Sequence, residues 1–426
     1  ASCQAHRSAS KAATDDAVAS FDVTDGHGTE TAAQTDCCVT TSVSSLTTTV
    51  NKFSSSSGFQ AATQVFNSGN LQVAVGNGLT ADTAFDAERM ADNINDQISA
   101  GASMVFGGLS SEAARAAGKQ AARNNVIYFA TQASANELTG AKGHRRIFRE
   151  SISAHMAANA IGRYLGAEVA DKKLFYITAS DSWGFSAEAS MRRITATTDT
   201  AIHQSVPVQY PKPSHKDLEN ALAAAASSDA SILVLIQYGP DLATTLQIAR
   251  NRNLQERFTI VVPLLDLETA REIGAGALEG VIGAMAWNHD VPAALNSDKT
   301  KRFIDHYIDR FQHYPSAGAA SAYNVVYQYA EAVRRAGTTD TDKVIQALED
   351  YRYTGLKGEQ QWRAFDHQNL QTVYVVKGRP RVDVVSDRFK ENFFEILDQM
   401  APEDAAIGYK QWSDERKAAS QPVQLD

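Results

Sequence analysis

The chain has 426 residues, too many for one ordinary hydrophobic core, and this length indicates two or three domains. Its 40 Lys and Arg against 49 Asp and Glu give a net charge of −9 without any basic block, which argues against nucleic acid as a partner, because phosphate binding needs clustered cations. No apolar run approaches the roughly 20 residues of a membrane span.

The first segment, residues 1–36, is rich in Ala, Ser, Thr and Asp and holds almost no large apolar side chains, so we interpret it as a tail. The chain starts without a Met or an apolar stretch, and we expect that a signal peptide has been removed. A bridge from Cys3 to Cys37 or to Cys38 would pin the tail in an oxidising compartment. The small residues before Cys3 also match the end of a lipoprotein signal, which would make Cys3 a lipid anchor.

From about residue 38, segments with strand character alternate with segments of helical spacing. Strands are predicted at 39–43, 71–75, 103–106, 126–129, 174–178, 205–208, 231–236, 258–262, 281–286 and 372–376. Helices are predicted at 84–98, 112–123, 154–165, 183–194, 216–226, 242–250, 269–273, 301–312, 319–335 and 342–348. The alternation predicts an α/β protein with parallel sheets covered by helices on both faces. Beyond Arg381 we expect helix formers and a polar tail.

The stretch Val105-Phe106-Gly107-Gly108-Leu109-Ser110-Ser111 looks like a strand that runs into the start of a helix. Two interpretations of Ser110 and Ser111 stay open on these residues. The serines cap their own helix, or they help a helix start with free N–H groups to bind a carboxylate or phosphate.

Motifs for catalysis, metals and cofactors are missing from the sequence. The glycines of 274–280 have the wrong spacing for a dinucleotide-binding loop, and 184–188 lacks the last Gly of a nucleophile elbow. The histidines show no metal-ligand spacing with a carboxylate partner. We therefore expect no catalytic residue, no metal and no cofactor, and do not expect an enzyme.

Polar and aromatic residues instead follow several predicted strands, at the edge where open α/β sheets bind ligands. They are Ser110 and Ser111, Ala133 and Ser134, Asp181 and Trp183, Tyr238, and Asp266. Each also has a purely structural explanation. Ser134 with Glu137 matches a capping box, Trp183 fits a core position, and Tyr238 fits a turn before a helix with proline at its start.

The order of these motifs resembles the type I periplasmic solute-binding proteins, in particular the branched-chain amino-acid, hydrophobic amino-acid and amide group that serves ABC importers. The resemblance runs from about Val39 to Gly378. It is carried by 105–111, 126–139, Phe148-Arg149, Asp181-Ser182-Trp183-Gly184, Tyr238-Gly239-Pro240-Asp241, 278–281 and 315–337. Two features depart from the family: about 36 residues precede the first strand, and Ser45-Leu46-Thr47-Thr48 replaces the usual Pro-Leu-Thr-Gly.

The resemblance implies two α/β lobes, three connections between them, and a ligand in the cleft. We expect residues 37–150 and 287–355 in lobe 1, 151–286 and 356–380 in lobe 2, and 381–426 as a C-terminal extension. In the family, the loops that match Ser110-Ser111 and Ala133-Ser134 hold the carboxylate or amide of the ligand.

The remaining site positions come from the same resemblance. Trp183, where the family usually has Tyr, and Tyr238 would pack on the ligand, and the larger ring suits a flat or aromatic one. Gln132 stands where a small polar residue is common. An acid near Asp266 often meets an ammonium group, with a register open by two or three residues.

The predicted function is therefore capture of a small carboxylate or amide, such as an amino acid or aromatic acid, in the periplasm and its delivery to an ABC permease. The alternative is a sensor or accessory protein of the same fold that acts on another partner, because the tail and the extension are unusual.

Overall fold

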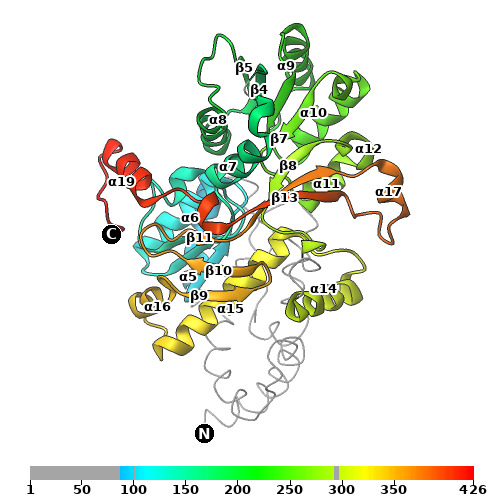
Figure 1. The fold of residues 1–426 in the computed structure, drawn as a ribbon. Coiled ribbons are helices and arrows are strands. Elements are labelled where there is room, and N and C mark those ends of the chain that lie inside the picture. The colour runs from blue at the N-terminus through cyan, green and yellow to red at the C-terminus, as the bar shows by residue number, and fades with distance from the viewer. Residues whose placement is uncertain (1–86, 100–101, 170, 292–296) are drawn as a thin grey trace.

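The computed structural model describes residues 87–99, 102–169, 171–291 and 297–426, which form two α/β lobes (Figure 1). The strands predicted at 39–43 and 71–75, the tail and the three cysteines lie outside these residues. Among the residues that the structure describes, none of the helices has the length and apolar character of a transmembrane segment.

Lobe 1 contains a parallel sheet in the order β1-β2-β3, in which Val105 pairs with Tyr128 and Tyr128 with Ile147. Its strands are β1 (Met104–Gly107), β2 (Ile127–Ala130) and β3 (Ile147–Arg149). The helices of this lobe are α5 (Ala87–Ser99), α6 (Ser111–Arg123), η2 (Asn136–Leu138), α14 (Asp298–Phe311), α15 (Ala317–Ala336) and α16 (Thr341–Leu348). All side chains of β1 and β2 are buried, as their apolar sequences predict.

A small antiparallel sheet packs on lobe 1. It consists of β9 (Arg352–Gly355), β10 (Gly358–Trp362) and β11 (Asn369–Leu370). The Trp362 ring lies 5.4 Å from the Phe129 ring and 5.6 Å from the Phe148 ring, and His367 stacks on Phe148 at 3.8 Å. Because these contacts tie residues 352–370 to lobe 1, we propose that its boundary lies after 370, rather than after 355.

Lobe 2 is built on a seven-stranded sheet in the order β13-β12-β8-β7-β6-β4-β5. The strands are β4 (Leu174–Ala179), β5 (Ser205–Val208), β6 (Ile232–Ile236), β7 (Thr259–Val262), β8 (Ile282–Met285), β12 (Val373–Gly378) and β13 (Phe394–Met400). The five from β4 to β8 are parallel, β12 is antiparallel to β8, and β13 is antiparallel to β12. The wholly apolar β6 lies near the centre, where both faces are covered.

Helices flank this sheet as the alternating pattern predicted. They are α7 (Ala154–Leu165), η3 (Gly166–Val169), α8 (Ser182–Ile194), α9 (His215–Ser227), α10 (Gly239–Asn251), η4 (Leu254–Glu256), α11 (Leu267–Ile273) and α12 (Ala275–Leu278). The α/β fold with two lobes agrees with the prediction.

From residue 87 onward, where the structure describes the chain, it passes between the lobes three times: after β3, after β8 and after β11. We call the first and third passages the first connection (149–153) and the third connection (370–373).

The segment beyond Arg381 contains helices, as its helix formers predicted, and one strand that the sequence analysis did not expect. It forms α17 (Arg381–Ser386), the edge strand β13, α18 (Pro402–Ala405) and α19 (Tyr409–Ala418). Figure 1 shows β13 in lobe 2 and α19 beside lobe 1. Trp412 Nε1 donates to the Thr139 carbonyl oxygen at 3.0 Å, and Arg416 donates to the carbonyl oxygen of Gly140 at 2.7 Å. These contacts pack α19 against lobe 1, and the polar tail of the prediction is left to the residues after Ala418.

Candidate functional site

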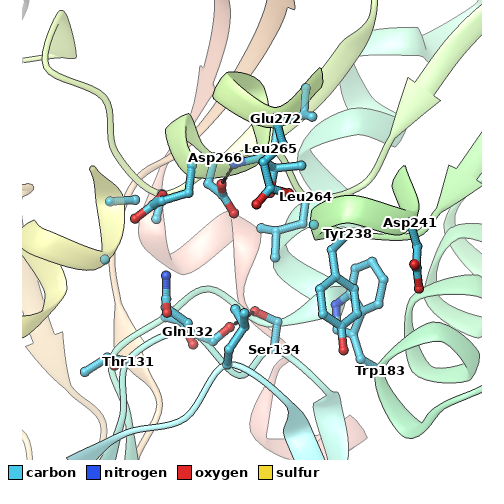
Figure 2. Close-up of a pocket in the computed structure, with 18 of the residues that line it drawn as sticks. Thr131, Gln132, Ser134, Trp183, Tyr238, Asp241, Leu264, Leu265, Asp266 and Glu272 are labelled. Carbon is cyan, nitrogen blue, oxygen red and sulfur yellow. Dashed lines mark hydrogen bonds between the residues drawn. The ribbon is translucent and has the colours of Figure 1, made fainter. Parts of the chain in front are cut away.

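A cavity of ≈ 460 Å³ lies between the lobes, at the edge of the sheets where the parallel strands end. This volume falls within the range of about 300–1,000 Å³ that is usual for small-molecule sites. Figure 2 shows Asp266 and Glu272 of lobe 2 on one side of it, Gln132 and Ser134 of lobe 1 opposite them, and aromatic rings at the flank. Lobe 2 therefore supplies carboxylates and rings, and lobe 1 supplies amide and hydroxyl groups.

The two lobes also touch beside the cavity. Glu112 of α6 accepts a hydrogen bond from the backbone N–H of Ser182, the first residue of α8, at 3.0 Å. A carboxylate at a helix N-terminus is favourable, since the first N–H groups have no partner within the helix. This contact joins a lobe 1 helix to a lobe 2 helix.

The acidic end of the cavity comes from the start of α11. Asp266 caps this helix, because its Oδ1 accepts from the Thr269 N–H at 2.7 Å. Glu268, which also lines the cavity, is only 6% exposed. Ser316 and Asp266 interact with its carboxylate, but among the described residues neither of its oxygens receives a well-aligned hydrogen bond. Burial and the neighbouring Asp266 raise the pKa of Glu268 to about 7. A buried carboxylate that lacks such hydrogen bonds is costly, so this end of the cavity favours a cation or a donor.

The side chains of Gln132 and Glu268 both lie close to Gly318, in the first turn of α15. A Cβ at position 318 would lie 2.7 Å from Gln132 Nε2 and 3.4 Å from Glu268 Oε1. The absence of a side chain there keeps this part of the cavity open. Gln132 Oε1 has no hydrogen-bond partner within the described chain, and it is thus free to accept one from a ligand.

The flank of the cavity is an aromatic wall made of Trp183, Tyr210 and Tyr238. The rings of Trp183 and Tyr238 meet edge to face at 5.0 Å, and those of Tyr210 and Tyr238 lie 4.7 Å apart. The Tyr238 hydroxyl donates to Asp181 Oδ2 at 3.2 Å, which fixes its ring. Burial raises the pKa of Asp181 to about 6. The wall offers broad apolar faces, which suit an apolar or aromatic group.

Five of the eight residues predicted from the sequence line this cavity: Gln132, Ser134, Trp183, Tyr238 and Asp266. The structure thereby brings together residues from both lobes that are far apart in the sequence. Trp183 is 4% exposed, so it serves the core and the cavity wall at once.

The other three predicted residues lie behind the described wall. Ser110 Oγ caps α6 by accepting from the Ala113 N–H at 3.1 Å, and Ser111 Oγ accepts from the Ala135 N–H at 3.2 Å. Ala133 is fully buried. The two serines hold the wall loop in place, and Leu109 just before them lines the cavity.

The capping box expected from Ser134 and Glu137 is not formed. The short helix η2 has Ala135 as its N-cap and no side-chain cap, and Ser134 Oγ donates to the Gln132 carbonyl oxygen at 3.3 Å. That structural explanation of Ser134 is therefore wrong.

The sequence prediction missed Glu268, Tyr210, Gly318 and Ser321, which also line the cavity. Glu268 is two residues from Asp266, within the register that the resemblance left open. No motif marked the other three. In the described chain, no group of three or more His, Cys, Asp or Glu side chains is placed to hold a metal ion.

Comparison with known proteins agrees with this geometry. A family model described as periplasmic binding protein matches residues 39–381. The leucine-, isoleucine-, valine-, threonine- and alanine-binding protein of Pseudomonas aeruginosa is 22% identical over 289 residues, which cover 68% of this chain and 74% of that protein.

Solved structures share the fold. A periplasmic binding protein from Burkholderia mallei has a TM-score of 0.69 at 20% identity, covering 83% of this chain and 92% of its own. A solute-binding protein of an ABC transporter from Rhodopseudomonas palustris, in complex with 3,4-dihydroxybenzoic acid, has a TM-score of 0.64 at 18% identity, covering 76% and 85%. The chain therefore belongs to the periplasmic binding protein family and has the type I fold of the proteins that serve branched-chain amino-acid importers.

Proposed function

We propose that this protein captures a small solute with an amine and a carboxylate or amide, an amino acid or a close relative, and delivers it to an ABC permease. The observation that carries the proposal is Glu268, a buried carboxylate without a well-aligned hydrogen bond from the described residues, at one end of a cavity whose flank is aromatic. A ligand ammonium would supply the missing donors and the compensating charge.

The opposite wall suits the carboxylate or amide of such a ligand. Ser134 and Gln132 line it, and Thr131 Oγ1 is buried without a hydrogen-bond partner among the described residues. We assign the polar head of the ligand to this loop, with Ser110, Ser111 and Ala133 as the residues that support it. The ligand side chain then lies against Trp183 and Tyr238.

The proposal extends to how the protein works. The ligand is released unchanged after the lobes open by hinge motion, and no covalent step is involved. The protein acts in the periplasm, with a lipid at Cys3 as its attachment to the membrane, and mass spectrometry of the N-terminal peptide from a membrane fraction tests that attachment.

The first experiment is to denature the purified protein and identify any small molecule that it releases. The refolded, ligand-free protein is then heated with branched-chain and aromatic amino acids, their amides, and aromatic acids. A true ligand at 100 times its Kd should add about 2.7 kcal/mol to the free energy of unfolding. If no compound raises the unfolding temperature, the proposal fails. Recovery of a receptor in place of a permease in a pull-down would favour the sensor alternative.

A further inference from the structure

Lys357 is a buried cation in the turn between β9 and β10. It is not among the residues that line the cavity. Its ammonium group donates to Glu150 Oε2 at 2.8 Å, to Ser321 Oγ at 2.9 Å and to Gln371 Oε1 at 3.0 Å. A lysine ammonium has three N–H groups, so each one has an acceptor. This arrangement leaves the side chain no freedom to point elsewhere.

The three acceptors belong to three functionally different parts of the fold. Glu150 lies in the first connection between the lobes, and Gln371 lies in the third. Ser321 lies on α15 and lines the cavity. Lys357 therefore joins the cavity wall to two of the passages on which the lobes turn.

Further hydrogen bonds tie the same two connections together. Asn324 Nδ2 donates to Glu150 Oε1 at 3.1 Å, and Gln371 Nε2 donates to the Glu150 carbonyl oxygen. The side chains of Lys357 and Glu150 are both 0% exposed. Burial lowers the pKa of Lys357, and Glu150 opposes this effect. A buried ion pair often adds little net stability, because burying two charges is costly. The role of this pair is therefore better explained by the arrangement of the two connections that it fixes.

The bond from Lys357 also orients the Ser321 hydroxyl. Because the oxygen accepts from the ammonium, the hydroxyl proton must point away from it. Ser321 lies at the cavity wall, one helical turn after Gly318, so a proton that points away from Lys357 can reach an acceptor in the cavity.

We propose that Lys357 is a positioning residue for ligand binding. It directs the Ser321 hydroxyl into the cavity and fixes the position of Ser321 relative to the first and third connections. This inference rests on the proposed function, because it needs a ligand in the cavity. It adds that one buried side chain links the cavity wall to both connections.

The test is a double-mutant cycle on ligand affinity. Lys357→Met alone would leave Glu150 as an uncompensated buried charge, so the background is Glu150→Gln with Lys357→Met. Ser321→Ala is introduced into the wild type and into this background, and the Kd of one ligand from the panel is measured for all four proteins. Circular dichroism and the unfolding temperature establish that each variant is folded.

We expect Ser321→Ala to weaken binding about tenfold in the wild type and less than about twofold in the background without the lysine. A purely structural lysine would lower the unfolding temperature and leave the tenfold effect of Ser321→Ala intact, which would overturn the proposal. An unchanged Kd in the Glu150→Gln, Lys357→Met protein would overturn it as well.

Gln360→Ala is the matched control, because Gln360 belongs to the same buried network but does not line the described cavity. It accepts from Asn324 at 3.1 Å and donates to Asn369 at 2.7 Å. Its loss should lower stability and leave the Kd within about twofold. Wild-type binding is measured first and tests the proposed function, whereas the ratio of the two Ser321 effects tests Lys357, so the two failures are distinct.

Discussion

Glu268→Gln tests the amine subsite most directly. The change keeps the size of the side chain and removes the charge from a carboxylate that is only 6% exposed. A hydrogen bond to a charged group contributes about 1.5–3 kcal/mol, so the variant should bind an amine-bearing ligand about 10–150-fold more weakly.

A matched pair of ligands makes the assay specific. Phenylalanine and 3-phenylpropionate share the ring and the carboxylate and differ in the amine, and titration calorimetry at about pH 7.5 measures both. The loss in Glu268→Gln should be confined to phenylalanine. Glu272→Gln, which changes a neighbouring carboxylate on the same helix, serves as the control with a smaller effect. Equal losses for the two ligands, or none, would refute the assignment of the amine to Glu268.

Without ligand, the same carboxylate should destabilise the protein near neutral pH. Its pKa lies above the usual 4.5, at about 7, so the folded protein holds this proton more tightly than the unfolded chain. The free energy of unfolding should therefore fall as the pH rises from about 4.5 to about 7, by about 3 kcal/mol from this group. Other buried carboxylates with raised pKa values remain in Glu268→Gln, so urea titrations across this range should show a fall that is larger by about 3 kcal/mol in the wild type than in this variant. Parallel curves of stability against pH for the two proteins would contradict the raised pKa of Glu268.

Three further variants test other parts of the cavity. Gly318→Ala places a Cβ 2.7 Å from Gln132 Nε2, so the Gln132 amide must shift and affinity for ring-bearing ligands should fall in calorimetry. Trp183→Ala should weaken binding of an aromatic ligand more than Ser111→Ala does, and equal losses would exclude the aromatic wall. Asp181→Asn keeps a helix cap but removes a carboxylate with a pKa of about 6. Between about pH 4 and 6, wild-type stability should therefore fall relative to this variant in urea titrations, and coincident curves would count against it.

Local rules and the family resemblance predicted which loops surround the cavity, but not which side chains in them face it. Ser110 and Ser111 were placed at the correct helix start, and both interpretations of them used the same residues. Their hydroxyls bond to backbone N–H groups, one within α6 and one across to Ala135. The second partner depends on how two loops meet, which no local pattern encodes.

Glu268 and Tyr210 line the cavity but were not predicted from the sequence, because only their contacts in three dimensions place them there. Asp266 and Glu268 are two residues apart, and the sequence alone does not distinguish which of them would bind an amine. In the structure Asp266 accepts the capping hydrogen bond from the Thr269 N–H, whereas Glu268 receives no well-aligned hydrogen bond from the described residues. Tyr210 follows a short strand in an unremarkable loop, and it becomes part of the site through its contact with Tyr238.

Strand β13 also determines where the chain can be truncated without exposing an apolar edge of the lobe 2 sheet. The family match ends at 381, but β12 is a Val-Tyr-Val-Val strand whose outer backbone groups pair with β13. A fragment that ends at 381 would expose an apolar edge ready to pair with another copy and aggregate. Among the described residues β13 is the outermost strand at this edge, and its Glu395 and Asp398 would discourage such pairing. We therefore expect a chain truncated at 381 to associate more readily than one that retains β13.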